Sequence, residues 1–252
     1  MRSAIVIPAR YASSRLPGKP LLHDTGKYLV QHVYEQACKR RAHCVVVATD
    51  DERIQRAVQS FGGRVMMTRA DHPSGTDRVA EVAQNLEADI IVNLQGDEPL
   101  IEPEILNLLP ELFDSDREAD VATLAVPIRS LVRWQDPNCV KVVCDVHGRA
   151  LYFSRAPIPY VRGGRPDFGA APRSFLQHLG LYAYRREFLV HLASLPPAPH
   201  EEFEKLEQLR VLALGRRIHV GIVAHEGRGV DTPADYAQFV NDYRAAVPSL
   251  AA

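Results

Sequence analysis

The stretch AIVIPARYASSRLPGK, residues 4–19, joins a short apolar run to a segment that carries three cations. Four consecutive apolar residues at 4–7 predict a β-strand that is covered on both faces, because a half-exposed strand would alternate apolar and polar residues. Two prolines and a glycine among the residues that follow disfavour a helix there. The stretch therefore predicts a buried strand and then a loop that presents Arg10, Arg15 and Lys19.

The following part of the chain continues this alternation of apolar runs and amphipathic segments. Strands are expected at 44–50, 64–68 and 89–95, and helices at 28–41, from 52 to 62, and from 76 or 77 to 86. Because the apolar runs are continuous, we expect parallel strands with helices on both faces of the sheet. Open parallel sheets bind ligands outside the carboxyl ends of their strands, so the loops after these runs are the expected site.

The second half of the sequence is organised differently. Three short strand-like runs follow one another without long helices, and a segment rich in Pro and Gly comes next, at 121–128, 140–145, 150–154 and 156–172. A helix near 201–215, a strand at 217–224 and a helix from Pro233 complete the chain. We therefore expect one α/β domain over residues 1–252, with a mostly parallel sheet flanked by helices and an antiparallel insertion at about 121–200.

The composition indicates a globular protein with no excess of either charge. The 252 residues include 30 Lys and Arg against 31 Asp and Glu, which gives a net charge of −1. No nucleic-acid partner is expected, since binding many phosphates needs a basic excess. The four cysteines match no zinc or redox spacing, and no run approaches the roughly 20 apolar residues of a membrane span. The first apolar run is too short for a signal peptide, so a cytoplasmic protein without membrane insertion is expected.

Two acidic turns follow extended segments at distant places in the sequence. In NLQGDEP, residues 93–99, Gly96 allows a sharp turn that presents Asp97, and in GVDTP, residues 229–233, Asp231 takes the same place before a helix. The first turn alone is equally typical of a helix start, where acidic residues interact favourably with the helix dipole, and the second turn alone is more typical of one. Together, at strand ends of one parallel sheet, they predict two carboxylates that converge on one magnesium ion over phosphate groups.

The cationic loop after the first strand has the chemistry of a phosphate site. Guanidinium groups bind phosphate oxygens in pairs and a lysine adds a point charge, so Arg10, Arg15 and Lys19 suit a triphosphate. The alternative is a solvated charged loop, and the position directly after the first strand favours the phosphate site. The loop is not a Walker loop, because Pro20 follows Lys19, and it is not a dinucleotide fingerprint, because it contains a single glycine.

Three further motifs are weaker on their pattern alone. SGTDR, residues 74–78, enters a helix whose N-terminus suits an anion, and a helix capped by Thr76 or Asp77 explains the motif equally well. In HLGLYAY, even spacing places His178 and Tyr182 on one face of an extended segment, which by itself makes neither residue a ligand. The carboxylates of EKLEQLR are typical of the solvated face of an amphipathic helix.

Nine segments carry a resemblance to a known family, and they occur in one order over residues 5–235: IPARYASSRLPGKPL, VVVATDD, MTRADHPSGTDR, VNLQGDEPLI, VKVV, ALYFSRAPIP, HLGLYAYR, LEQLRVL and GVDTP. On these segments the chain resembles the 3-deoxy-manno-octulosonate cytidylyltransferases, or CMP-KDO synthetases. Two departures are Gly26-Lys27-Tyr28, where the family has Gly-Lys-Pro, and the poorly matching segment 161–173. The second departure leaves open whether this segment acts as a lid and which sugar is accepted.

The resemblance implies an enzyme that converts CTP and 3-deoxy-D-manno-octulosonate (KDO) into CMP-KDO and pyrophosphate for bacterial lipopolysaccharide. It implies a Rossmann-like nucleotide-diphospho-sugar transferase fold, a requirement for magnesium and a cytoplasmic homodimer. By the family's pattern, the catalytic residues are Arg10, Arg15 and Lys19 on the triphosphate, with Asp97 and Asp231 on magnesium. The nucleotide site also includes Ala9, Ser74, Arg78 and Gln95, and the sugar site includes Arg155, His178, Tyr182, Glu207 and Gln208.

Three alternative functions have to be weighed against this one. A cytidylyltransferase for another acidic sugar, such as sialic acid or an amino analogue of KDO, would share the nucleotide half and differ around Arg155, His178 and Gln208. A non-catalytic nucleotide sensor would keep the fold, although the presence of both Asp97 and Asp231 argues against it. A dinucleotide-dependent dehydrogenase is disfavoured because the glycine fingerprint is missing.

Overall fold

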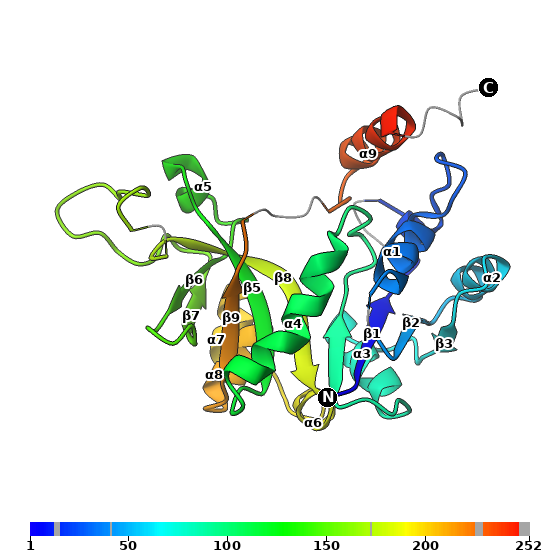
Figure 1. Ribbon diagram of the computed structural model, residues 1–252, viewed down its shortest axis with the longest axis horizontal. Coiled ribbons are helices and arrows are strands. Elements are labelled where there is room, and N and C mark those ends of the chain that lie inside the picture. The colour runs from blue at the N-terminus through cyan, green and yellow to red at the C-terminus, as the bar shows by residue number, and fades with distance from the viewer. Residues whose placement is uncertain (13–15, 41, 172, 225–228, 247–252) are drawn as a thin grey trace. The chain divides into compact units, whose positions relative to one another are not determined.

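The structure is a computed structural model that describes residues 1–12, 16–40, 42–171, 173–224 and 229–246 (Figure 1). The chain divides into two compact units. The first unit joins the two ends of the chain, Met1–Asn107 and Gly227–Ala252, and the second unit is the intervening segment Leu108–Glu226. The chain passes from the first unit into the second within helix α4, Pro103–Ser115.

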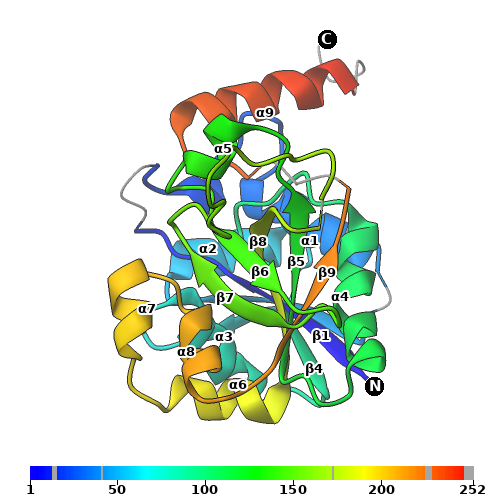
Figure 2. The ribbon, with the colours of Figure 1, turned by 90° about the vertical axis from the view of Figure 1, so that its left-hand side faces the viewer.

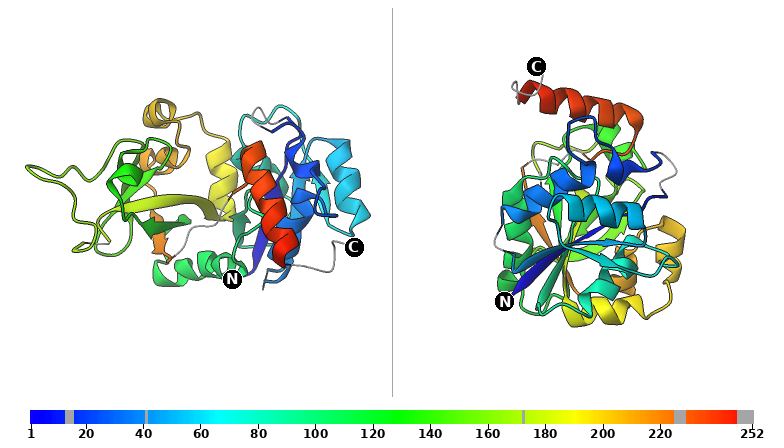
Figure 3. Two further views of the ribbon diagram at one scale, coloured as in Figure 1. Left: turned by 90° about the horizontal axis from the view of Figure 1, so that it is seen from above. Right: turned by 90° about the vertical axis from the view of Figure 1, so that its right-hand side faces the viewer.

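Four parallel strands form the sheet of the first unit in the order β3-β2-β1-β4. Their bounds are β1 Ser3–Pro8, β2 Cys44–Thr49, β3 Val65–Met67 and β4 Ile90–Asn93. The register places Ile5 opposite Val45 on one side and Val92 on the other. Residues 4–7 are all buried, as their continuous apolar character predicts. Figure 3 shows these strands, in blue and cyan, among the helices of the same unit.

The helices of the first unit differ in whether a side chain caps their first turn. Their bounds are η1 Lys19–Leu21, α1 Leu29–Cys38, α2 Glu52–Ser60, α3 Gly75–Ala83 and α9 Pro233–Ala246. The Asp51 carboxylate caps α2 by accepting from the Arg53 N–H at 2.8 Å. The expectation that Thr76 or Asp77 caps α3 is wrong. The Ser74 hydroxyl accepts from the Asp77 N–H at 3.2 Å, so the cap lies two residues before Thr76 and the helix begins at Gly75.

The second unit mixes antiparallel and parallel pairing (Figure 2). Its strands are β5 Val121–Pro127, β6 Lys141–Cys144, β7 Ala150–Ser154, β8 Leu176–Arg185 and β9 Ile218–Ile222. Strand β5 is antiparallel to β8 and parallel to β9, whereas β6 is antiparallel to both β7 and β8. The predicted antiparallel strands therefore exist, and the predicted fold class, mostly parallel α/β with antiparallel strands in the second half, is confirmed. The expectation of a single domain over 1–252 stays a prediction.

One predicted helix of the second unit is two helices. The unit contains α5 Leu131–Gln135, α6 Arg186–Ala193, α7 Pro199–Glu204 and α8 Gln208–Ala213. The single helix expected at 201–215 is wrong, because Lys205 takes a left-handed backbone conformation with φ +53° that ends α7. The Arg210 guanidinium binds the Glu201 carboxylate at 2.5 Å, which fastens α8 to α7 after this break. Within the described ranges, no helix has the length and apolar character to cross a membrane.

Candidate active site

A cavity of about 350 Å³ lies in the first unit, at the carboxyl ends of β1 and β4 and the start of α3. Open parallel sheets bind ligands at this edge, so the cavity occupies the place that the strand pattern predicts. Six residues from the predicted nucleotide and metal sites are among those that line it: Ala9, Arg10, Lys19, Gln95, Asp97 and Asp231. The structure therefore brings together residues that lie up to 222 positions apart in the sequence, from Ala9 to Asp231.

The Lys19 ammonium group binds both carboxylates that line this cavity. Its Nζ donates to Asp97 Oδ2 at 2.7 Å, to Asp231 Oδ1 at 3.2 Å and to the Val230 carbonyl at 2.9 Å. The two carboxylates come from the turn after β4 and the turn before α9. Both acidic turns therefore converge on one cation, and in this structure that cation is the lysine side chain.

Two glycines shape the backbone that brings Lys19 and Asp97 together. Gly18 has φ +69°, a left-handed conformation that places Lys19 at the start of η1. A Cβ on Gly96 would lie 2.8 Å from the carbonyl oxygen of Pro8, so a larger residue would push the Asp97 turn away from the end of β1. The Val230 N–H then donates to the Asp97 carbonyl at 2.8 Å and ties the second turn to the first.

The turn that carries Asp231 is fixed by the helix that follows it. The Asp235 carboxylate accepts from the backbone N–H groups of Asp231 and Thr232 at 3.2 and 2.8 Å. Helix α9 is in turn anchored by Tyr236, whose hydroxyl accepts from the Asp24 N–H at 2.9 Å. Buried apolar side chains around it, Leu16, Leu29, Val230, Phe239 and Val240 among them, form a cluster under the turn. The position of Asp231 is thus set by packing as well as by hydrogen bonds.

The donor set of the cavity fits a magnesium ion. Asp97 and Asp231 each place a carboxylate oxygen within hydrogen-bonding distance of one nitrogen, so a single cation can reach both groups. Magnesium takes oxygen ligands and is usually held by one or two carboxylates, with substrate phosphates and water completing its shell. The side chains of the two aspartates are 29% and 45% exposed, which leaves them open to a ligand in the cavity.

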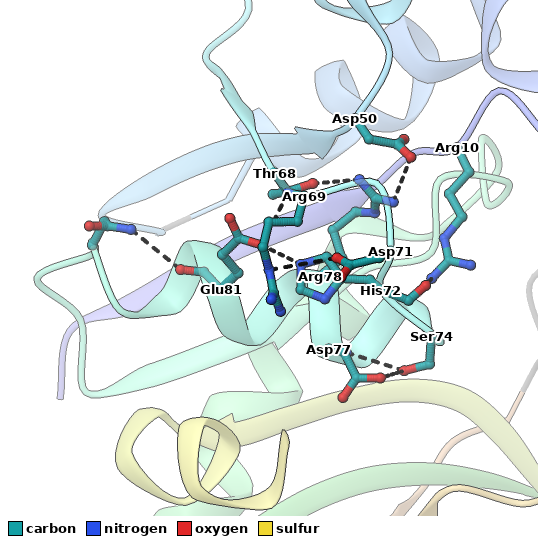
Figure 4. A network of polar contacts seen from close by, with 11 residues as sticks. Arg10, Asp50, Thr68, Arg69, Asp71, His72, Ser74, Asp77, Arg78 and Glu81 are labelled. Carbon is teal, nitrogen blue, oxygen red and sulfur yellow. Dashed lines mark hydrogen bonds and ion pairs between the residues drawn. The ribbon is translucent and has the colours of Figure 1, made fainter. Parts of the chain in front are cut away.

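Arg10 is oriented by the loop between β3 and α3 (Figure 4). Its guanidinium Nη2 donates to the His72 carbonyl at 3.1 Å. The His72 ring is buried and its Nε2 contacts the Glu81 carboxylate, which also accepts from the Arg69 N–H at 3.2 Å. Arg15, the other predicted phosphate ligand, lies outside the described residues.

Glu81 is the residue that binds both His72 and Arg69 of this loop. Burial alone raises the pKa of Glu81, but the hydrogen bonds from His72 and the Arg69 N–H, with the charges of both residues, hold the pKa below its ordinary value. The carboxylate therefore stays ionised and keeps its two partners. Sequence reasoning missed both His72 and Glu81. The histidine stands beside the quoted SGTDR motif, but nothing in the pattern shows that its ring pairs with a carboxylate nine residues later.

Arg78 and Ser74 have structural partners in this state. Arg78 is 0% exposed, and its guanidinium contacts Thr68 Oγ1 and lies 3.1 Å from Asp50 Oδ2. It thereby connects α3 to the ends of β2 and β3 (Figure 4). The Ser74 hydroxyl donates to Asp77 Oδ2 at 2.7 Å. Direct contact of either residue with a nucleotide stays a prediction, and the geometry of Arg78 supports an indirect role.

In the second unit, buried His178 and half-buried Tyr182 form an aromatic pair. Their ring centroids lie 5.3 Å apart, so the prediction that even spacing places them on one face is confirmed. The His178 ring is 3.0 Å from the Thr123 hydroxyl, and burial lowers the pKa of His178 to about 3, which keeps the ring neutral. Burial, together with the nearby charges of Tyr184 and Glu207, raises the pKa of Tyr182 well above its ordinary value. Glu207 therefore lies close enough to Tyr182 to affect its pKa, and a sugar site at these residues stays a prediction.

Arg155 is held in place by backbone carbonyls. Its Nε donates to the Glu204 carbonyl at 2.7 Å and its Nη1 to the Pro137 carbonyl at 3.0 Å. Its own carbonyl accepts from the ammonium group of Lys141, a fully buried lysine that sequence reasoning missed. Gln208 is also buried, and its Nε2 has no hydrogen-bond partner among the described residues. Whether these residues bind a sugar stays a prediction.

A parallel α/β unit that gathers a lysine, an arginine and two carboxylates at its strand ends is suited to a nucleotide's phosphates and a metal ion. The cytidylyltransferase family model matches residues 4–218. The chain belongs to the cytidylyltransferase family, a family of nucleotidyltransferases.

Relatives with established names cover more than nine tenths of the chain. The 3-deoxy-manno-octulosonate cytidylyltransferase of Syntrophobacter fumaroxidans is 52% identical and covers 100% of this chain and 98% of its own. The protein of the same name from Halorhodospira halophila is 51% identical over 92% of this chain and 93% of its own. A solved structure of CMP:2-keto-3-deoxy-manno-octonic acid synthetase complexed with CTP has a TM-score of 0.90 and 47% identity, and the match covers 98% of this chain and 100% of that chain.

Proposed function

We propose that the protein transfers the cytidylyl group of CTP to 3-deoxy-D-manno-octulosonate, releasing pyrophosphate and forming CMP-KDO for bacterial lipopolysaccharide synthesis. The observation that carries the proposal is the convergence of Asp97 and Asp231 on the Lys19 ammonium group, in a cavity that Arg10 also lines. Relatives of about 50% identity over the full chain bear the name of this activity, and a solved relative of 47% identity is complexed with CTP.

In the proposed reaction the C2 hydroxyl of KDO attacks the α-phosphorus of CTP. A bond forms between this hydroxyl oxygen and phosphorus, the bond from the α-phosphorus to the bridging oxygen breaks, and pyrophosphate and a proton are released. Catalysis of this kind depends mainly on placement of the reactants and on stabilisation of charge. Lys19 and Arg10 line the cavity and would neutralise charge that grows on the leaving pyrophosphate.

Magnesium is the cofactor that the donor set supports. Asp97 and Asp231 would hold it, and when bound it would polarise the α-phosphate and stabilise the leaving group. Gly96 and the α9 cap keep the two carboxylates within reach of a single cation.

Fewer observations support the identity of the sugar than support the nucleotide and metal sites. Arg155 would pair with the carboxylate of KDO, because a guanidinium group matches a carboxylate in geometry and charge. His178, kept neutral by burial, and Gln208, with a free buried amide nitrogen, supply uncharged polar groups suited to hydroxyls. A cytoplasmic homodimer is part of this proposal, and the exposed apolar side chains of Leu151 and Tyr160 are consistent with a subunit interface.

Pyrophosphate release from CTP with a panel of sugar acids tests the proposal. We expect KDO to be the best substrate, with its 8-amino analogue and sialic acid weaker. Preference for another acid would keep the cytidylyltransferase and reject KDO as its sugar. CTP binding without turnover on any acid would identify a nucleotide sensor instead. Gel filtration checks the dimer independently.

A further inference from the structure

The Lys19 ammonium group has no hydrogen-bond donor left for a phosphate. An ammonium group has three N–H donors. Asp97, Asp231 and the Val230 carbonyl accept at 2.7, 3.2 and 2.9 Å, which accounts for all three. The Lys19 side chain is only 12% exposed, so it is enclosed by these partners. A lysine that binds phosphate in the working enzyme must therefore first release some of its present contacts.

The two carboxylates need this cation when nothing else is bound. They come from turns that packing and hydrogen bonds hold side by side, through Gly96 and through the Val230 N–H. Two carboxylates gathered in this way repel one another, and a neighbouring cation removes the repulsion. The same oxygen atoms suit a divalent cation, so the ammonium group and the metal would compete for them.

We propose that Lys19 holds Asp97 and Asp231 together in the nucleotide-free protein, and that the divalent cation enters only when nucleotide phosphates draw the ammonium group away. This inference rests on the proposed function, since it takes the nucleotide and the metal from it. Lys19 then has two successive sets of partners, the carboxylates before nucleotide binding and the phosphates after it. The two carboxylates keep a cationic partner throughout the exchange, because the ammonium group leaves them only as the divalent cation binds.

The exchange predicts how metal affinity depends on Lys19 and on the nucleotide. Without nucleotide, the wild-type protein should bind a divalent cation weakly, because the ammonium group occupies the carboxylate oxygens. Lys19→Met removes the ammonium group and keeps a side chain of similar length. This variant should bind the cation at least about tenfold more tightly, since the two carboxylates have lost their competitor. Lys19→Arg keeps the charge and should bind as weakly as the wild type.

The test uses Mn²⁺ as the probe and electron paramagnetic resonance to count the bound ion, with no sugar present. Mn²⁺ binding to wild type should appear on addition of α,β-methylene-CTP, a nucleotide that cannot release pyrophosphate. The gain in Lys19→Met should vanish in the double variant Lys19→Met, Asp97→Asn. Lys27→Met is the matched control, because it removes another lysine–carboxylate pair, with Glu35 at 2.7 Å, that lies outside the cavity. It should leave Mn²⁺ binding unchanged.

Two results would overturn the inference. One is equal Mn²⁺ affinity of wild type and Lys19→Met without nucleotide, and the other is tight binding to wild type that nucleotide does not strengthen. The second result needs only the wild-type protein, so it is informative even if Lys19→Met does not fold. Failure of the proposed function would be seen separately, as absence of pyrophosphate release by wild type from CTP and KDO with Mg²⁺.

Discussion

Lys19 in the first unit and Lys141 in the second are both withdrawn from solvent, and both use three hydrogen bonds, yet their partners differ in kind. Lys19 binds two carboxylates and one carbonyl. Lys141 donates to three backbone carbonyls, those of Asp136, Cys139 and Arg155, at 2.9, 2.6 and 2.6 Å. Carboxylates accept any cation of suitable size, whereas these carbonyls are fixed in the backbone. The first lysine is therefore exchangeable and the second is architectural.

The same contrast extends to the surroundings of each lysine. Around Lys19 the turns end strands and begin helices, so a ligand can enter from the open edge of the sheet. Around Lys141 the ammonium group joins the irregular residues before β6 to the residue after β7, and burial lowers the pKa of Lys141. Loss of Lys19 should thus be felt in ligand binding, and loss of Lys141 in stability.

The largest expected effect is on turnover at the exchangeable site. Asp97→Asn removes one charge from the carboxylate pair and should lower kcat by about a thousandfold, because the metal loses a charged ligand. The fold should persist, since the side chain is partly exposed and its packing is unchanged. Steady-state pyrophosphate release measures kcat and circular dichroism checks the fold. Near-normal turnover would remove Asp97 from the metal site and break the comparison.

The second effect is on stability at the architectural site. Lys141→Met leaves three backbone carbonyls without their donor, one of them in a fully buried hydrogen bond, and should lower the free energy of unfolding by about 3 kcal/mol. Lys27→Met is again the control, because its partly exposed ion pair should contribute less than about 1 kcal/mol. Urea denaturation measures both. Equal losses in the two variants would mean that Lys141 is not an anchor.

A third effect concerns one buried histidine in each unit. Burial lowers the pKa of His32 to about 4 and that of His178 to about 3, against an ordinary value of 6.5. Below pH 6.5 the unfolded chain binds protons that the folded protein does not, so the stability present above pH 6.5 is lost as the pH falls toward these values. Each histidine should contribute a slope of about 1.4 kcal/mol per pH unit between pH 6 and 5.

Urea denaturation at pH 7, 6 and 5 measures this slope. His32→Asn and His178→Gln should each flatten it relative to the wild type. The two variants separate the contributions of the units, because His32 binds Thr25 in the first unit and His178 binds Thr123 in the second. An unchanged slope in both variants would show that neither ring stays neutral in the folded protein.

The smallest expected effect comes from the loop that orients Arg10. Glu81→Gln weakens the hold on His72 and the Arg69 N–H and should raise KM for CTP by about threefold to tenfold, with a smaller change in kcat. The matched control is Glu52→Gln, which removes an exposed pair with Arg56 on α2. A kcat loss without a KM change would place Glu81 in a different role.

The parallel strands could be predicted because a strand that is buried on both faces is a continuous apolar run in the sequence. Residues 4–7 are continuous apolar residues, and all four are buried. Helix α4 was not predicted, since Pro110 inside it is usually a helix breaker. The break at Lys205 was not predicted either, because Lys205 takes the left-handed conformation without the glycine that usually marks such a helix end.

Part of the candidate site could also be predicted, and part could not. Asp97, Asp231 and Lys19 could be placed together because parallel strands end at one edge, so turns that are distant in sequence meet there. Their mutual contacts could not be predicted, and neither could the burial of Arg78 and Lys141. Charged residues of these types are almost always exposed unless paired, and a sequence does not show which partners tertiary packing will supply.

The dependence of turnover on Mg²⁺ tests the central claim most directly, when measured for wild type and for Asp231→Asn. We expect no pyrophosphate release from CTP and KDO in excess EDTA, recovery on addition of Mg²⁺, and an Mg²⁺ requirement at least about tenfold higher in the variant. Full turnover in EDTA, or the same Mg²⁺ requirement in both proteins, would contradict it.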